Sequence, residues 1–244
     1  MKLNCDMGES YGSWVMGLDS EVMQYVDMAN IACGFHASDP QTMDKTVKLA
    51  IANNVTVGAH PGYPDLLGFG RRNISFSSSE ITNMVLYQVG ALQAICHGNG
   101  TELKYIKPHG ALYNTMMSEP EVLSAVMTAV KLFDSTVPLM IMADAKHDQY
   151  RKQAEENNIS LIFEAFCDRA YTDSGSLSSR SEKGAVLSSV DEIKKQVEEL
   201  VINHRVKTVS GAYIKVHADT ICVHGDNQFA LEAVKNIRHF LESI

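Results

Sequence analysis

The chain has 244 residues, of which 45% are hydrophobic and 20% are charged, and its formal net charge is −8 at pH 7. This negative charge makes nucleic acid and acidic membrane surfaces unfavourable partners, and an anionic ligand would need a local cluster of arginine or lysine. The length suffices for a full hydrophobic core, and β/α barrels of this size commonly form one domain. We therefore expect a single domain over residues 1–244.

Neither a membrane span nor a disulfide framework is predicted. No apolar run approaches the roughly 18 residues of a transmembrane helix, and Met1-Lys2 leads into an apolar run without a signal peptide. The five cysteines are an odd number without a CxxC pair, which argues against disulfides. We expect Cys5, Cys33, Cys167 and Cys222, which fall inside predicted strands, to be small buried residues, and the protein to be cytoplasmic.

Seven short apolar runs alternate with segments of helical period, which predicts parallel strands joined by right-handed crossovers. The runs are Leu3–Met7, Met28–Cys33, Val55–Ala59, Leu103–Ile106, Leu139–Met142, Leu161–Phe166 and Thr220–Val223. So many crossovers in this length suit a closed barrel better than an open sheet. An eighth strand is best sought in Val206–Val216, which also fits a hairpin. The sequence predicts a (β/α) barrel of seven to eight mostly parallel strands.

Four helix starts carry the capping-box pattern, in which a serine is followed three residues later by Glu or Gln. The pairs are Ser38 with Gln41, Ser77 with Glu80, Ser118 with Glu121, and Ser189 with Glu192. Pro40 in the first of these is compatible with a first helical turn.

Polar side chains follow the predicted strands, at the end where barrel enzymes carry their chemistry. Four of the nine histidines hold this position, namely His36, His60, His109 and His224. Any one of them alone is equally explained as a hydrogen-bonded structural imidazole, but all four would converge in a closed parallel barrel. Neutral imidazoles beside carboxylates bind divalent metals or move protons. Asp6, His36 and His60 are one possible ligand trio, although no HxxxH or HExxH spacing supports a metal.

Two loops have unusual compositions. The segment His60–Arg72 (HPGYPDLLGFGRR) is rich in Gly and Pro and ends in two arginines, either of which would bind a carboxylate in a bidentate manner. A surface turn with solvated arginines is the alternative. The segment Asp168–Ala185 is long and polar, and we expect a lid over the site rather than a disordered loop. Its anion-facing groups would be Arg169, Tyr171, Arg180 and Lys183.

Three common nucleotide or nucleophile motifs are absent from the sequence. It contains no GxxxxGK[ST] phosphate loop, no GxGxxG after a predicted strand and no GxSxG nucleophile elbow. Any bound nucleotide is therefore not held by a P-loop.

Six segments together resemble the LamB/YcsF family. They are LNCDMGESYG, NIACGFHASDP, VGAHPGYPDLLGFGRR, IKPHGALYN, FEAFCDRAYTDSGSLSSR and DTICVHGD. The likeness runs from Leu3 to Asp226, and the one departure is Ser38, where a glycine is expected. The resemblance implies a distorted barrel of the glycoside hydrolase/deacetylase type. It also implies ATP-dependent opening of 5-oxo-L-proline to L-glutamate, with ATP and Mg²⁺ as co-substrate and two carboxylase-like partner subunits.

This chemistry needs a base for water, an electrophilic clamp for the lactam oxygen and a cation for the substrate carboxylate. Our hypothesis gives these roles, in that order, to Asp6 or Glu9 with His36, to Lys107 with His109, and to Arg71 or Arg72. Further substrate contacts are assigned to His60, Arg169, His224 and Asp226. Two alternatives remain open at this point. One is a metal-dependent amidohydrolase or sugar deacetylase that does not use ATP, and the other is a non-catalytic substrate-binding protein within a larger complex.

Overall fold

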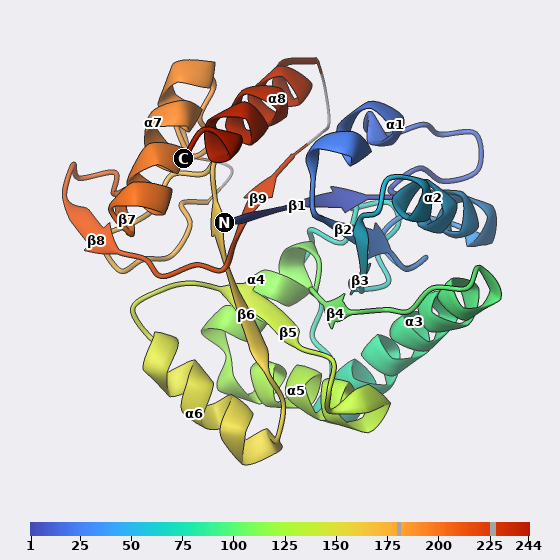
Figure 1. Ribbon diagram of the computed structural model, residues 1–244. Helices are drawn as coiled ribbons and strands as arrows, with labels where there is room; N and C mark the ends of the chain where they lie inside the picture. The colour runs from blue at the N-terminus through green and yellow to red at the C-terminus, as the bar shows by residue number, and fades with distance from the viewer. Residues whose placement is uncertain (180–181, 225–227) are drawn as a thin grey trace.

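The protein is described here from a computed structural model, which covers residues 1–179, 182–224 and 228–244. Seven strands form a closed barrel in the order β1-β2-β3-β4-β5-β6-β9, and every neighbouring pair is parallel (Figure 1). The barrel strands are β1 (Lys2–Met7), β2 (Met28–Ala32), β3 (Thr56–His60), β4 (Tyr105–Ile106), β5 (Leu139–Met142), β6 (Leu161–Phe166) and β9 (Thr220–Val223). The predicted distorted (β/α) barrel is confirmed.

Helices surround this barrel, as Figure 1 shows. They are α1 (Asp19–Val22), the 3₁₀ turn η1 (Met23–Tyr25), α2 (Pro40–Ala52), α3 (Ser78–Gly98), α4 (Gly110–Ser118), α5 (Pro120–Asp134), α6 (His147–Asn157), α7 (Val190–Ile202) and α8 (Gln228–Glu242). Helix α3 packs against α5 along the apolar stripe that begins at Ile81. Because helices cover the outside, strands such as β2 and β9 are buried along their whole length, as parallel strands usually are.

The expected eighth strand lies outside the barrel. Residues Arg205–Lys207 (β7) and Tyr213–Lys215 (β8) pair antiparallel in a separate two-stranded sheet. The hairpin alternative for this segment is therefore confirmed, and the barrel closes with seven strands. Strand β9 fills the closing position by pairing with both β6 and β1.

One of the four predicted capping boxes is confirmed in full, at Ser77 and Glu80, where both reciprocal hydrogen bonds form at the start of α3. Ser189 also caps its helix, because its hydroxyl accepts from the Glu192 N–H at the start of α7. The prediction at Ser118 is wrong, because Pro120 begins α5 and the Ser118 hydroxyl donates back to carbonyls of α4. The prediction at Ser38 is also wrong.

Asp39 caps α2 in place of Ser38, with its carboxylate accepting from the N–H groups of Gln41 and Thr42. Ser38 has a φ of +74°, whereas an N-cap residue needs an extended backbone. The left-handed region favours glycine, so the turn itself explains why a glycine is expected at this position.

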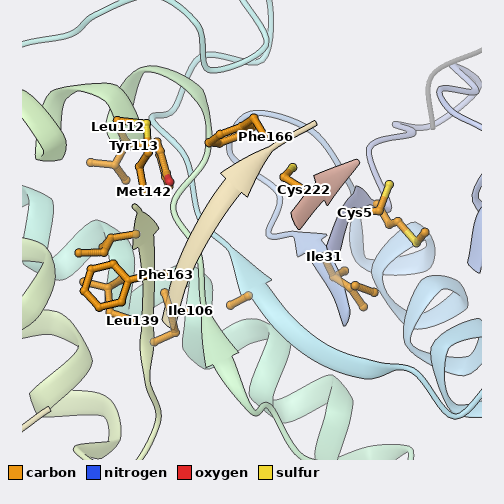
Figure 2. Close-up of a cluster of buried hydrophobic side chains, with 14 of the residues drawn as sticks. Cys5, Ile31, Ile106, Leu112, Tyr113, Leu139, Met142, Phe163, Phe166 and Cys222 are labelled. Carbon is orange, nitrogen blue, oxygen red and sulfur yellow. The ribbon is translucent and has the colours of Figure 1, made fainter. Parts of the chain in front are cut away.

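The core fills the space between strands and helices, and Figure 2 shows side chains of β1, β2, β5, β6 and β9 in one cluster with those of α4. All five cysteines are buried and free, and they include the four predicted to be buried. None of the described helices is long and apolar enough to cross a membrane.

Candidate active site

A cavity of about 1150 Å³ opens at the carboxyl ends of the barrel strands. Most of the side chains predicted for the site line it, namely Asp6, Glu9, His60, Arg71, Lys107, His109, Arg169 and His224. His36 is fully buried and lies behind His109, on which its ring stacks. Arg72 is not among the lining residues, and Asp226 and Arg180 lie outside the described residues. The parallel barrel therefore brings segments that are far apart in sequence to one pocket.

Lys107 is the charged centre at the base of the cavity. Its side chain is only 3% exposed, and its ammonium lies 2.9 Å from Asp6 Oδ1 and 3.1 Å from Glu164 Oε2. Burial lowers the pKa of Lys107, but the nearby Asp6, Cys222 and Glu164 outweigh burial and hold that pKa well above its usual range. Lys107 is therefore a fixed positive charge rather than a base.

Asp6 is held as a carboxylate. Asn30 donates to its Oδ1 at 2.7 Å, and His60 Nε2 lies 3.3 Å from Oδ2. Burial raises the pKa of Asp6, but His60 and Lys107 outweigh burial and hold that pKa well below its usual range. An ionised oxygen beside the cavity is what a water-activating group requires.

A layer of amides and hydroxyls supports these charges from inside the barrel. Asn30 also donates to Asn4 Oδ1 at 2.9 Å, Tyr105 donates to Asn30 Oδ1 at 2.6 Å, and Asn4 donates to Thr220. These groups are fully buried, and buried polar groups of this kind fix one geometry when each has a partner.

Three imidazoles pack together beside Asp6 and Glu9. His36 and His109 stack with ring centroids 3.7 Å apart and an interplanar angle of 3°. His60 Nε2 faces His109 Nδ1 at 2.9 Å. Glu9 Oε1 lies 3.3 Å from His36 Nε2 and 3.6 Å from His109 Nδ1.

The two stacked rings, His36 and His109, are neutral. Burial, with His109 and His60 nearby, holds the pKa of His36 well below its usual range. Burial likewise lowers the pKa of His109 to about 3, with His60 adding to the shift. These two imidazoles therefore act as hydrogen-bonding or ligating groups at neutral pH.

The loop that follows β3 wraps the imidazole cluster closely. A Cβ on Gly62 would lie 2.7 Å from His36 Nδ1, and a Cβ on Gly70 would lie 2.7 Å from His36 Cβ and 2.9 Å from His109 Cδ2. Gly70 also has a φ of +63°. Only glycine fits these two positions, which explains the glycine content of the loop.

The two arginines of this loop have different surroundings. Arg72 binds the buried Asp65 carboxylate through Nε and Nη2, and Asp65 also accepts from the N–H of Gly68. Arg72 therefore stabilises the loop through an ion pair with another residue of the same loop. Arg71 lines the cavity, with its guanidinium 5.1 Å from the ring of Phe69.

The segment after β6 folds back against the barrel. Arg169 is buried and donates to the carbonyls of Ser178 and Ala185, which ties the loop together. Tyr171 is fully buried and accepts from the Phe166 N–H. Asp168 pairs with His224 at 2.7 Å. Arg169 and His224 still line the cavity, whereas Tyr171 is part of the core and does not face an anion.

Some important groups were given no role in the hypothesis drawn from the sequence. Glu164 is fully buried inside β6, and a glutamate within the apolar run LIFEAF is a signal of a functional carboxylate. Asn30 likewise interrupts the apolar β2. The carbonyl of Phe69, which contacts His109 Nε2 at 2.8 Å, carries no such signal.

Among the described residues, two groups of side chains converge closely enough to hold a metal ion. One is Glu9, His36, His60 and His109, and the other is Asp6, Cys222 and His224. Of the trio predicted as ligands, His36 and His60 fall in the first group and Asp6 in the second.

A parallel barrel with acid–base groups gathered at the carboxyl ends of its strands is the arrangement found in β/α-barrel enzymes. The chain belongs to the LamB/YcsF family, whose family model matches residues 1–244.

Relatives of similar length align with this sequence over nearly its whole length. A Vibrio parahaemolyticus protein, named as the A subunit of 5-oxoprolinase, is 56% identical over 243 residues, covering 100% of this chain and 96% of its own length. A Pseudomonas fluorescens protein of the same name is 49% identical, covering 98% and 96%. The crystal structure of a lactam utilization protein from Thermus thermophilus superimposes with a TM-score of 0.92 at 40% identity, covering 100% and 96%.

Proposed function

We propose that this chain is the A subunit of a 5-oxoprolinase, which hydrolyses 5-oxo-L-proline to L-glutamate while ATP is cleaved to ADP and phosphate. The Lys107–Asp6 pair at the base of the cavity carries the proposal, because it places a fixed cation and an ionised carboxylate side by side. Full-length relatives that bear the 5-oxoprolinase name support the choice of substrate.

The proposed reaction has to overcome amide resonance in the five-membered ring. Transfer of a phosphoryl group from ATP to the amide oxygen removes this resonance and opens the carbonyl carbon to attack by water. The C–N bond then breaks and the ring nitrogen takes a proton, which leaves an acyl phosphate of glutamate. A second water hydrolyses this acyl phosphate to glutamate and phosphate. One water is consumed for the lactam and one for ATP.

The site residues supply three roles in this scheme. Asp6, or Glu9 with His36, accepts the proton of the attacking water, and Lys107 with His109 stabilises negative charge on the oxygen. Arg71 binds the substrate carboxylate. His60, His224 and Arg169 provide further substrate contacts at the cavity wall, as would Asp226 outside the described residues.

We assign ATP, with Mg²⁺, as co-substrate, and we assign two carboxylase-like partner subunits to the working enzyme. The sequence has no P-loop, and the relatives are named as one subunit of their enzyme, which supports an assembly with others. The cavity, at about 1150 Å³, is also larger than a single five-membered ring needs. The five free cysteines support a cytoplasmic setting.

Glutamate release from 5-oxoproline tests this function. We expect the chain alone to release little glutamate, and the chain with its two partners to release glutamate in step with ADP. Robust ATP-coupled release by the chain alone would disprove the partner requirement. Release that is indifferent to ATP but lost with a chelator would instead indicate a metal-dependent amidohydrolase.

The two adjacent arginines provide a matched pair of variants. Arg71→Ala should weaken 5-oxoproline binding about 10- to 100-fold, because a charge-assisted contact contributes roughly 1.5–3 kcal/mol. Arg72→Ala should leave affinity nearly unchanged and lower the melting temperature, because Arg72 binds Asp65 within the loop. Isothermal titration calorimetry with both variants measures the difference. Equal affinity of Arg71→Ala and the wild type would show that the substrate carboxylate binds elsewhere.

A further inference from the structure

The short distance between a nitrogen of His60 and a nitrogen of His109 is not explained by the roles proposed for these two residues. His60 Nδ1 lies 2.7 Å from the carbonyl of Lys107, and His109 Nε2 lies 2.8 Å from the carbonyl of Phe69. A carbonyl oxygen only accepts, so each of these nitrogens carries a proton and donates it. In a neutral imidazole the other nitrogen then presents a lone pair. These two nitrogens, His60 Nε2 and His109 Nδ1, lie 2.9 Å apart.

A third donor atom, Glu9 Oε1, lies 3.6 Å from His109 Nδ1. Two lone pairs and a carboxylate oxygen around one point require a positive species between them. Asp6 Oδ2 also lies 3.3 Å from His60 Nε2, so carboxylates of both Asp6 and Glu9 border this pair of imidazoles. A shared proton joins only two of these atoms, whereas a metal ion accepts three or more. Metal-bound histidines also usually donate their far nitrogen to a carbonyl or carboxylate, as both of these rings do.

Carboxylates also gather around these imidazoles. Asp6 and Glu164 lie beside the Lys107 ammonium, and Glu9 Oε1 lies 3.3 Å from His36 Nε2 and 3.6 Å from His109 Nδ1. A carboxylate oxygen beside two imidazole nitrogens is a donor set that divalent metal ions accept in proteins.

His36 orients Glu9 and is not a ligand. Its Nδ1 is buried, has no hydrogen-bond partner among the described residues, and faces Gly62. A proton on Nδ1 would be a buried donor without an acceptor, which costs about 1–3 kcal/mol. The proton therefore sits on Nε2, which donates to Glu9 Oε1 at 3.3 Å. A protonated Nε2 cannot also bind a metal.

We propose that Glu9, His60 and His109 hold a divalent cation of the zinc class through Oε1, Nε2 and Nδ1, with His36 as the residue that positions Glu9. At a metal–nitrogen distance of about 2.1 Å, the 2.9 Å nitrogen separation subtends roughly 90° at the ion. The 3.6 Å separation from Glu9 Oε1 subtends roughly 120° at the same ligand distance. Two imidazoles and one carboxylate leave coordination positions open toward the cavity, where water or the lactam oxygen would bind.

The metal site would form part of the proposed active site and so rests on the proposed function, but its test does not require a measurement of turnover. The chelator-treated chain is titrated with ZnCl₂ by calorimetry, and the metal content of the dialysed protein is measured by mass spectrometry. We expect one ion per chain and a higher melting temperature with zinc. Absence of stoichiometric binding would overturn the proposal and leave a proton shared by His60 and His109, whether or not glutamate is released with ATP.

Variants distinguish the ligands from their neighbours. Glu9→Gln and His109→Gln should each weaken zinc binding at least 100-fold, with circular dichroism confirming the fold. His224→Gln, in the second convergent group, should bind zinc as the wild type does. His36→Phe keeps the ring stack on His109 and should bind one ion about 10- to 100-fold more weakly. Zinc binding that is lost in His224→Gln, or unchanged in Glu9→Gln, would place the ion elsewhere and overturn the assignment.

Discussion

Lys107→Met should give a folded protein that is about 3–5 kcal/mol less stable to unfolding and that supports no detectable turnover in the assembled enzyme. The Lys107 side chain is 3% exposed and pairs with both Asp6 and Glu164, so removing its charge leaves Glu164 without this counter-ion and Asp6 with only His60 beside it. Methionine matches the length of the lysine stem, and the loss is therefore electrostatic rather than a cavity. Urea unfolding followed by circular dichroism gives the stability, and glutamate release gives the turnover.

Lys104→Met is the matched control for this variant. Lys104 precedes β4, and its ammonium pairs with Glu102 at the surface, where exposed ion pairs contribute about 0–1 kcal/mol. A double variant Lys107→Met/Glu164→Gln should regain part of the lost stability, because one uncompensated charge is removed with the other. A Lys107→Met protein as stable and as active as Lys104→Met would show that the buried ion triad is not needed for folding or for chemistry.

The barrel could be predicted because the spacing of apolar residues along a segment shows which of its side chains are buried, without knowledge of the rest of the fold. The runs at Leu139–Met142, Leu161–Phe166 and Thr220–Val223 coincide with β5, β6 and β9. Helix starts were less predictable, because a capping box competes with other local signals. Pro120 decides where α5 begins, and the positive φ of Ser38 moves the cap of α2 to Asp39.

The sequence predicted which residues gather at the site, but not which groups each of them contacts there. Parallel strands place their carboxyl ends together, so the sequence was enough to bring Asp6, His60 and His109 to one cavity. Which arginine faces that cavity depends on the turn that Asp65 builds, and this turn is formed by contacts within the folded loop. The carbonyl that fixes the His109 ring belongs to Phe69. Every residue type has a backbone carbonyl, so the sequence gives no sign of this contact.

Asp6→Asn should lower turnover of the assembled enzyme about 10²- to 10⁴-fold while leaving the complex intact. Asparagine keeps the shape of the side chain and an acceptor for Asn30, and Lys107 retains Glu164 as its counter-ion, so the barrel should stay folded. What is lost is the ionised oxygen beside the cavity. Single-turnover glutamate release measures the chemical step, and size-exclusion chromatography measures the assembly.

The control for this variant is Asp219→Asn. Asp219 directly precedes β9 and accepts from the Phe163 N–H at 2.8 Å, at the opposite end of the barrel from the cavity. The Asp219→Asn variant should keep nearly full turnover, because the Asp219 side chain binds the backbone of β6 and does not line the cavity. If Asp6→Asn also kept full turnover, water would be activated by another group. Glu9, 3.3 Å from His36, would then be the group to test in the same assay.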